Sequence, residues 1–357
     1  MTNKPTLNIL PLGRQWPCLD PFLFCAYHDD AYPAANADMS PKASLAGRDM
    51  GQDFSRKDGW SMYHGRTVPG FPAHPHRGFE TVTIVRKGLI DHSDSLGATA
   101  RFGQGDVQWL TAGKGIVHAE MFPLLSQDSA NPLELFQIWL NLPAMSKMAE
   151  PHFTMFWAND IPSRVFTDAT GLQTVVSVIA GQLAGAADAV NALCPPPDSW
   201  AAQANADVAI WTLRMQPNAR FTLPTAKHGT RRNLYFFKGQ SVTVGGQNIS
   251  SHSAIELQGD EAVELVNGTE PAEFLMLQGQ PIAEPVAQYG PFVMNTQAEI
   301  RQTIADYQST QFGGWPWASQ APTHGLDPAR QATHPGGRVE APKSNLATCN
   351  DASNSSS

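Results

Sequence analysis

The chain has 357 residues, of which 42% are hydrophobic and 16% are charged, so it can bury one large core or two ordinary ones. Its formal net charge of −8 repels phosphate backbones, which argues against direct binding to nucleic acid. No stretch approaches the roughly 20 apolar residues that cross a bilayer. The N-terminus lacks the apolar core and cleavage site of a signal peptide. We therefore expect a cytoplasmic protein with no membrane partner.

Short apolar runs, separated by turn residues, dominate residues 1–183. The clearest runs lie at 81–85, 106–110, 134–142 and 173–181, and their lengths suit strands better than helices. Gly, Asn and Asp near their ends favour hairpins in a sandwich or barrel. Within this block, residues 29–59 show no periodicity and are predicted to form an inserted loop.

A second strand-rich block is expected over residues 206–317. The intervening segment, 184–205, contains three consecutive prolines, which stop a helix or a central strand and indicate a linker. Residues 295–308 place Ile300 and Ile304 at helical spacing, and Asn295 or Thr296 would cap that helix.

Residues 318–357 are rich in Pro, Gly, Ser, Asn and Thr and are predicted to form a disordered tail. The fold class expected from the residues is thus all-β, with two domains, one C-terminal helix and a loose tail.

Two motifs each place a pair of metal-binding side chains two residues apart. They are His74 and His76 in GFPAHPHRG, and His118 and Glu120 in GKGIVHAEM. In a strand this spacing directs both side chains to one face, so two neighbouring strands could hold one ion between them. Imidazole nitrogen and carboxylate oxygen suit iron, manganese, nickel, copper or zinc in an open site. The sequence therefore predicts one divalent transition metal bound by these four residues.

Glycine-containing turns support this interpretation, because they return one strand alongside another. Gly103 and Gly105 flank one such turn, and Gly113 and Gly115 precede His118. Without the second pair, a His-x-His motif on a strand is often incidental.

Other polar residues near the motifs are assigned less specific roles. Glu80 has the same parity as His74 and His76, so it is predicted to orient an imidazole as a hydrogen-bond acceptor, with a fifth metal ligand as the alternative. His92 is expected to serve a turn. His28 and His64 lack a spaced partner and are expected to have no functional role.

The longer motifs resemble the pirin family of the cupin superfamily. They are HPHRGFETVTIV, GDVQWLTAGKGIVHAEM, FQIWLNLP and EPVAQYGPFVMNT, and the resemblance extends from about residue 19 to about residue 308. It implies a bicupin, in which two jelly-roll (double-stranded β-helix) barrels pack together. It also implies a metal, typically iron(II), in the N-terminal barrel only, held by His74, His76, His118 and Glu120. The second barrel would cover and support the first.

The resemblance further implies a function. Members of the family are described as quercetin 2,3-dioxygenases, so we expect ring-opening oxygenation of a flavonol, a small planar phenolic substrate, by dioxygen, with Glu120 as the catalytic base. The alternative is a metal- or redox-responsive regulatory protein that binds a transcription or metabolic partner without turnover. A purely structural metal is a third possibility. The segment before the first motif is longer than in typical pirins and would shape or cap the pocket mouth.

Overall fold

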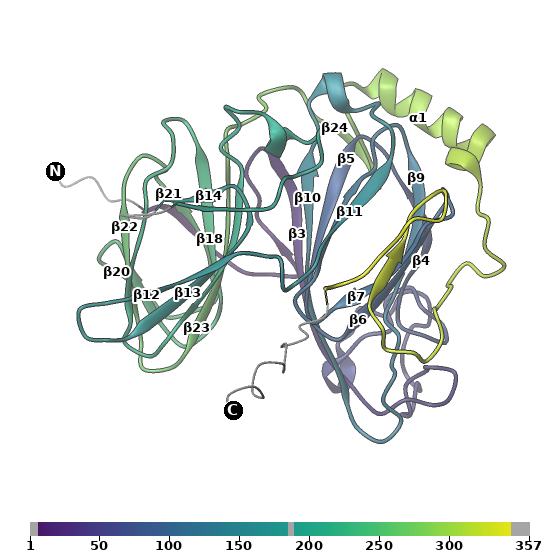
Figure 1. The fold of residues 1–357 in the computed structure, drawn as a ribbon, viewed down its shortest axis with the longest axis horizontal. Coiled ribbons are helices and arrows are strands. Elements are labelled where there is room, and N and C mark those ends of the chain that lie inside the picture. Colours follow the sequence, from purple (N-terminus) through teal and green to yellow (C-terminus); the bar gives the residue numbers. More distant parts are fainter. Residues whose placement is uncertain (1–5, 185–188, 344–357) are drawn as a thin grey trace, which may run out of the picture.

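A computed structural model describes residues 6–184 and 189–343 (Figure 1). The described chain is mostly strands and turns, and it forms two β-barrels that lie side by side (Figure 1). The expectation of an all-β, two-barrel fold with one C-terminal helix is therefore confirmed. None of the helices among the described residues is long and apolar enough to span a membrane.

The first barrel consists of two six-stranded sheets. One sheet has the order β11 (His152–Phe156), β8 (Val107–Thr111), β5 (Phe79–Lys87), β10 (Asn131–Asn141), β3 (Phe22–Tyr32) and β2 (Gln15–Trp16). The other has the order β27 (Val339–Glu340), β26 (Gln331–Thr333), β7 (Thr99–Gly103), β6 (Leu89–Asp94), β9 (Ile116–Met121) and β4 (Gly70–His76).

The second barrel pairs a seven-stranded sheet with a four-stranded one. The larger has the order β1 (Thr6–Pro11), β21 (Ser253–Leu257), β18 (Arg231–Lys238), β23 (Ala272–Gly279), β16 (Ala209–Met215), β13 (Gln173–Ala180) and β12 (Ser163–Thr167). The smaller has the order β17 (Arg220–Leu223), β22 (Val263–Asn267), β19 (Val242–Val244) and β20 (Gln247–Ile249). Because β1, β12 and β13 belong to this barrel, its sheets extend beyond the block predicted at 206–317.

The two barrels meet where the six-stranded sheet that contains β5 packs against the seven-stranded sheet of the second barrel. On β5, Val82 and Ile84 join an apolar cluster with Tyr235 and Phe237 of β18. The alternate residues of β5 point into the first barrel, because successive side chains on a strand lie on opposite faces. Thr83 is one of these inward residues. The contact between the barrels therefore fixes the position of β5, whose inner face is part of the wall of the first barrel.

The helices lie mostly at the surface. The α-helix α1 (Gln297–Thr310) is preceded by the hairpin β24 (Ala287–Tyr289) and β25 (Phe292–Met294). Short 3-10 turns occur at η1 (Lys57–Gly59), η2 (Ala144–Ser146), η3 (Trp200–Ala202) and η4 (Gln311–Gly313), and a small hairpin joins β14 (Gln182–Leu183) to β15 (Val190–Asn191).

Helix α1 confirms the helix predicted near residues 295–308. Thr296 caps it, and Glu299 completes a capping box with the Thr296 backbone. Ile300 packs with Val117 of β9 and Phe292. The C-terminal helix thus supports the strand that carries His118 and Glu120.

The prediction of a disordered tail from residue 318 is wrong for residues 318–343. Within that segment β26 pairs with β7, and Ala332 is fully buried. Arg101 of β7 donates hydrogen bonds to the carbonyl oxygens of Gly325 and Asp327. The composition of this segment gives it too few apolar residues to form a core of its own. It is ordered because its backbone pairs with the free edge of β7 and accepts hydrogen bonds from the buried Arg101 guanidinium. Residues 344–357 lie outside the described residues.

Removal of residues 318–357 is expected to lower the free energy of unfolding by about 2–4 kcal/mol. The guanidinium of Arg101 would lose two hydrogen-bond acceptors, and β7 would lose β26 while keeping its pairing with β6. Urea denaturation followed by circular dichroism measures the change. Removal of 344–357 alone is the control and leaves every contact named above in place. Equal stability of the two truncated chains would contradict the role of residues 318–343.

Candidate metal centre

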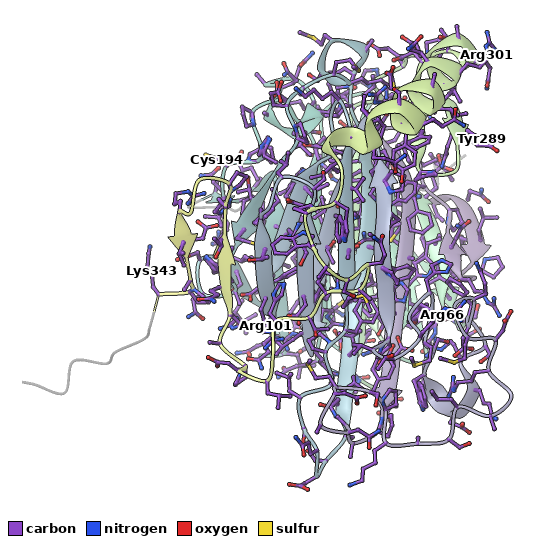
Figure 2. All side chains as sticks on the ribbon, turned by 90° about the vertical axis from the view of Figure 1, so that its right-hand side faces the viewer. Arg66, Arg101, Cys194, Tyr289, Arg301 and Lys343 are labelled. Atoms are coloured by element: carbon purple, nitrogen blue, oxygen red, sulfur yellow. The ribbon has the colours of Figure 1, made fainter. Side chains whose placement is uncertain are left out.

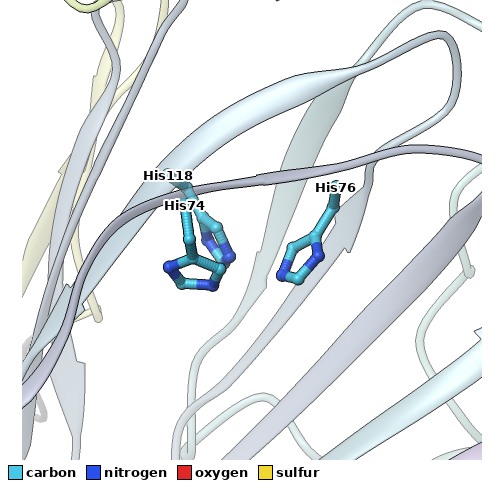
Figure 3. Close-up of side chains that lie close together, drawn as sticks. All are labelled: His74, His76 and His118. Carbon is cyan, nitrogen blue, oxygen red and sulfur yellow. The ribbon is translucent and has the colours of Figure 1, made fainter. Parts of the chain in front are cut away.

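Three imidazoles meet where β4 lies against β9. The two strands are antiparallel and place His74 directly opposite His118, with His76 two residues further along β4. One ligand atom from each of the three rings lies within 4.8 Å of the others. Figure 3 shows the three rings gathered in one region of the barrel. The predicted strand geometry thus brings residues from two distant motifs together.

The hydrogen bonding of these rings leaves nitrogen lone pairs free. His74 Nδ1 lies 2.8 Å from the carbonyl oxygen of Pro72, which can only accept, so Nδ1 carries the proton and Nε2 is unprotonated in the neutral ring. Nδ1 of His76 and both ring nitrogens of His118 are buried and have no hydrogen-bond partner within residues 6–184 and 189–343. Buried polar atoms of this kind are costly unless a ligand satisfies them. The residues therefore fit a divalent transition metal ion.

Burial also keeps these rings uncharged. It lowers the pKa of His74 to about 4, and it lowers the pKa values of His76 and His118 well below 6.5. The neighbouring imidazoles act in the same direction, since each disfavours a positive charge on the others. A neutral imidazole is the form that binds a metal.

Glu120 lies beside this group, with Oε2 3.9 Å from Nε2 of His118. Gln137 Nε2 donates to Glu120 Oε2 over 3.1 Å. The Thr83 hydroxyl lies 3.2 Å from Glu120 Oε1 and 2.6 Å from Gln137 Oε1, yet it has a single hydrogen to share between these two acceptors. A proton on Glu120 would satisfy both contacts, and burial raises the pKa of this carboxyl. Glu120 is thus placed to hold a proton.

Glu80 does not have the predicted partner. Its carboxylate accepts hydrogen bonds from Thr111 (2.7 Å) and Ser199 (2.5 Å), and none of the hydrogen bonds of the described residues joins it to an imidazole. The prediction assumed one continuous strand from His74 to Glu80. In fact β4 ends at His76 and the chain turns at Gly78, where φ is +85° and a Cβ would lie 1.9 Å from the Val293 oxygen. The turn ends the alternation of side chains that the prediction extended from His74 to Glu80. Glu80 instead holds the segment after the three prolines through its hydrogen bond with Ser199.

His92, expected in a turn, lies in strand β6 and is fully buried. It is directly opposite Glu120, and its ring centroid is 5.5 Å from that of His118. Its Nδ1 has no hydrogen-bond partner among the described residues. Sequence spacing missed His92, Thr83 and Gln137 because each reaches the site from a different strand.

A cavity of about 890 Å³ lies beside His74 and His76. His74, His76, Glu120, Thr83 and Gln137 line its inner part. Four large aromatic side chains, Phe24, Phe71, Phe122 and Trp139, are among its lining residues. Two histidines that were expected to have no functional role, His28 and His64, also line it. Asp38, within the predicted inserted loop, also lines the cavity, as do Arg66, Thr67 and Val68 just beyond the predicted end of that loop.

The fold and this site define a two-barrel cupin with a histidine cluster in its first barrel. Comparison with known sequences gives matches to the Pirin family over residues 8–140 and to the Pirin C-terminal cupin domain over 210–313. The chain belongs to the pirin family.

Several relatives illustrate this assignment. The chain is 34% identical to human Pirin over 257 residues, which cover 70% of this chain and 80% of that protein. It is 36% identical to Pirin-1 of Arabidopsis thaliana over 249 residues, which cover 68% and 78% of the two chains. A crystal structure of quercetin 2,3-dioxygenase from Acinetobacter baumannii matches with a TM-score of 0.66 and 27% identity, over 87% of this chain and 99% of that one.

The lowered histidine pKa values predict how the metal-free protein responds to acid. Between pH 6.5 and about 4, these histidines are protonated in the unfolded chain but remain neutral in the folded protein. Acidification through this window therefore lowers the free energy of unfolding. Glu80, whose pKa burial raises to about 7, acts in the opposite direction. Urea denaturation of chelator-treated protein at several pH values measures the sum of these effects.

A His118→Gln variant isolates the histidine contribution to this pH dependence. It is expected to lose less stability than the native chain between pH 6.5 and 4, even if it is less stable at every pH. Parallel pH profiles for the two proteins would show that His118 titrates normally in the folded state.

Proposed function

We propose that this protein is an iron(II)-dependent dioxygenase that opens the ring of a flavonol such as quercetin. The observation that carries the proposal is the group of three neutral imidazoles with free lone pairs, two of which line a cavity that also has four large aromatic side chains. His74, His76, His118 and Glu120 would hold the metal. When bound, the iron supplies a Lewis acid and a redox centre for dioxygen chemistry. Manganese, nickel, copper or zinc suit the same donors.

The chain's own residues would bind the substrate and move its proton. The rings of Phe71, Phe122 and Trp139 offer apolar faces to a planar phenol and exclude water from it. Glu120 would accept the proton of the reacting hydroxyl, since the Thr83 hydroxyl lies 3.2 Å from its Oε1 and can accept a hydrogen bond from the protonated carboxyl. Gln137 would keep the carboxylate oriented through its bond to Oε2.

A partner-binding regulatory role is the second candidate, and exposed apolar side chains favour it. Met145 is 88% exposed and Tyr289 is 64% exposed. The two lie on segments that a hydrogen bond from the Ala144 amide to Glu284 joins. Exposed methionine and tyrosine are common at protein interfaces. Oxygen consumption with a flavonol distinguishes the two functions, because a regulator of this kind needs no turnover.

His76→Ala is expected to lose most of its bound metal, because one of three neighbouring imidazole donors disappears. Elemental analysis of protein reconstituted with iron(II) under anaerobic conditions measures the metal-to-protein ratio. The control is His228→Ala, whose imidazole is on the surface, away from the cavity, with 94% of its side chain exposed. Full metal occupancy in His76→Ala would contradict the proposed ligand set.

Glu120→Gln is expected to keep part of its metal but to lower oxygen uptake with quercetin by about 100-fold or more, the usual effect of removing a general base. The amide can still accept hydrogen bonds but cannot take the substrate proton. Glu150→Gln, at an exposed position, is the matched control. Native turnover in Glu120→Gln at equal metal content would rule out the proposed base, and no turnover by the iron-loaded native protein would argue against the enzyme.

A further inference from the structure

The mouth of the cavity is built by two segments that lie far apart in the sequence. Met39 and Val68 pack with Met121 of β9, and Ala321 of the C-terminal segment packs against this cluster. The amide of Ala73 donates to the carbonyl oxygen of Gln320 over 2.7 Å, which ties the C-terminal segment to the strand that carries His74. Residues on this rim are therefore held in place relative to the three histidines.

The inserted loop is internally braced. Arg48 is buried, donates to Asp53 (2.8 Å) and to the carbonyl oxygen of Trp60 (2.8 Å), and stacks 3.5 Å above the Trp60 ring. Tyr63 has a φ of +56°, which is strained for a bulky residue, and its hydroxyl donates to Asp30 over 2.7 Å. Strained backbone persists only where its surroundings enforce it, so residues 64–68 follow a fixed anchor rather than a loose loop.

Arg66 stands on this rim. Among the described residues that line the cavity, it is the one lysine or arginine, and it is exposed. None of the ion pairs or side-chain hydrogen bonds of the described residues involves its guanidinium. Asp38 also lines the cavity, but its carboxylate accepts hydrogen bonds from the hydroxyl (2.5 Å) and amide (3.1 Å) of Ser40. Among the described residues, the rim thus presents one guanidinium that is not paired with a carboxylate, and the Asp38 carboxylate lies elsewhere on the same rim.

We propose that Arg66 binds an acidic group on the substrate, so that the cavity selects a planar phenol carrying a carboxylate, sulfate or sulfonate. This inference rests on the proposed function, which places the reacting hydroxyl of the substrate beside the three histidines. A volume of about 890 Å³ lies towards the upper end of the range for ligand pockets, which leaves room for a substituent beyond the phenolic rings. A guanidinium pairs with such oxyanions through two parallel hydrogen bonds.

The test compares quercetin with quercetin 5′-sulfonate on iron-loaded protein, using quenching of tryptophan fluorescence to measure both Kd values. The native protein is expected to prefer the sulfonate. Arg66→Gln is expected to reduce this preference by roughly 5- to 10-fold, because a charge-assisted hydrogen bond is lost at a partly solvated site. Quercetin binding and metal content should not change. The native preference should also fall as ionic strength rises.

Two further variants control for net charge. Arg301→Gln removes the same charge from an exposed position on α1, well away from Arg66 (Figure 2), and should leave the preference unchanged. Asp38→Asn removes a negative charge from the rim and should increase the preference. An Arg301→Gln effect equal to that of Arg66→Gln would attribute the preference to net charge and overturn the proposal.

The outcomes separate this inference from the proposed dioxygenase. Turnover of quercetin together with an unchanged preference in Arg66→Gln would overturn the role of Arg66 and leave the enzyme intact. Loss of the preference in Arg66→Gln without oxygen uptake by the native protein would support acid recognition and contradict the dioxygenase. Failure of the native protein to bind either compound would overturn the acid-recognition proposal.

Discussion

The antiparallel pairing of β4 with β9 is the constraint on which the candidate site depends. It sets His74 opposite His118, and the two-residue repeat of a strand then adds His76 and Glu120 to the same face. A slip of one residue would turn each pair away from its partner. The surrounding fold protects this register: α1 packs on β9 through Val117, and Gln320 bonds to the backbone of β4.

The second barrel contributes through packing rather than chemistry. Its interior is filled by a continuous apolar cluster that includes Trp211, Phe236 and Phe274, and the described residues place no metal-binding group there. Its seven-stranded sheet packs against β5 and β10 of the first barrel. Because the outer faces of those strands pack against the second barrel, Thr83 and Gln137 on their inner faces are held next to Glu120. A barrel without donors of its own thereby fixes the polar contacts of the candidate base.

Two segments outside β4 and β9 shape the outer part of the cavity and contribute none of the three clustered imidazoles. The segment that follows the inserted loop places Arg66 among the lining residues, and the C-terminal segment places Gln320 there. Metal ligation and substrate selection would thus depend on different parts of the chain. Such a division lets loops alter which ligand enters while the strands preserve the chemistry.

The sequence by itself determined the features that depend on local spacing. The strands around residues 81–85 and 134–142, the helix capped by Thr296 and the two ligand pairs all follow from backbone periodicity or capping. Tertiary structure alone decided which strands are neighbours. It therefore placed His92 opposite Glu120, turned Glu80 towards Ser199 and paired residues 331–333 with β7. These contacts join residues remote in sequence, and no local pattern encodes them because sheet order and register are set by the packing of the whole barrel.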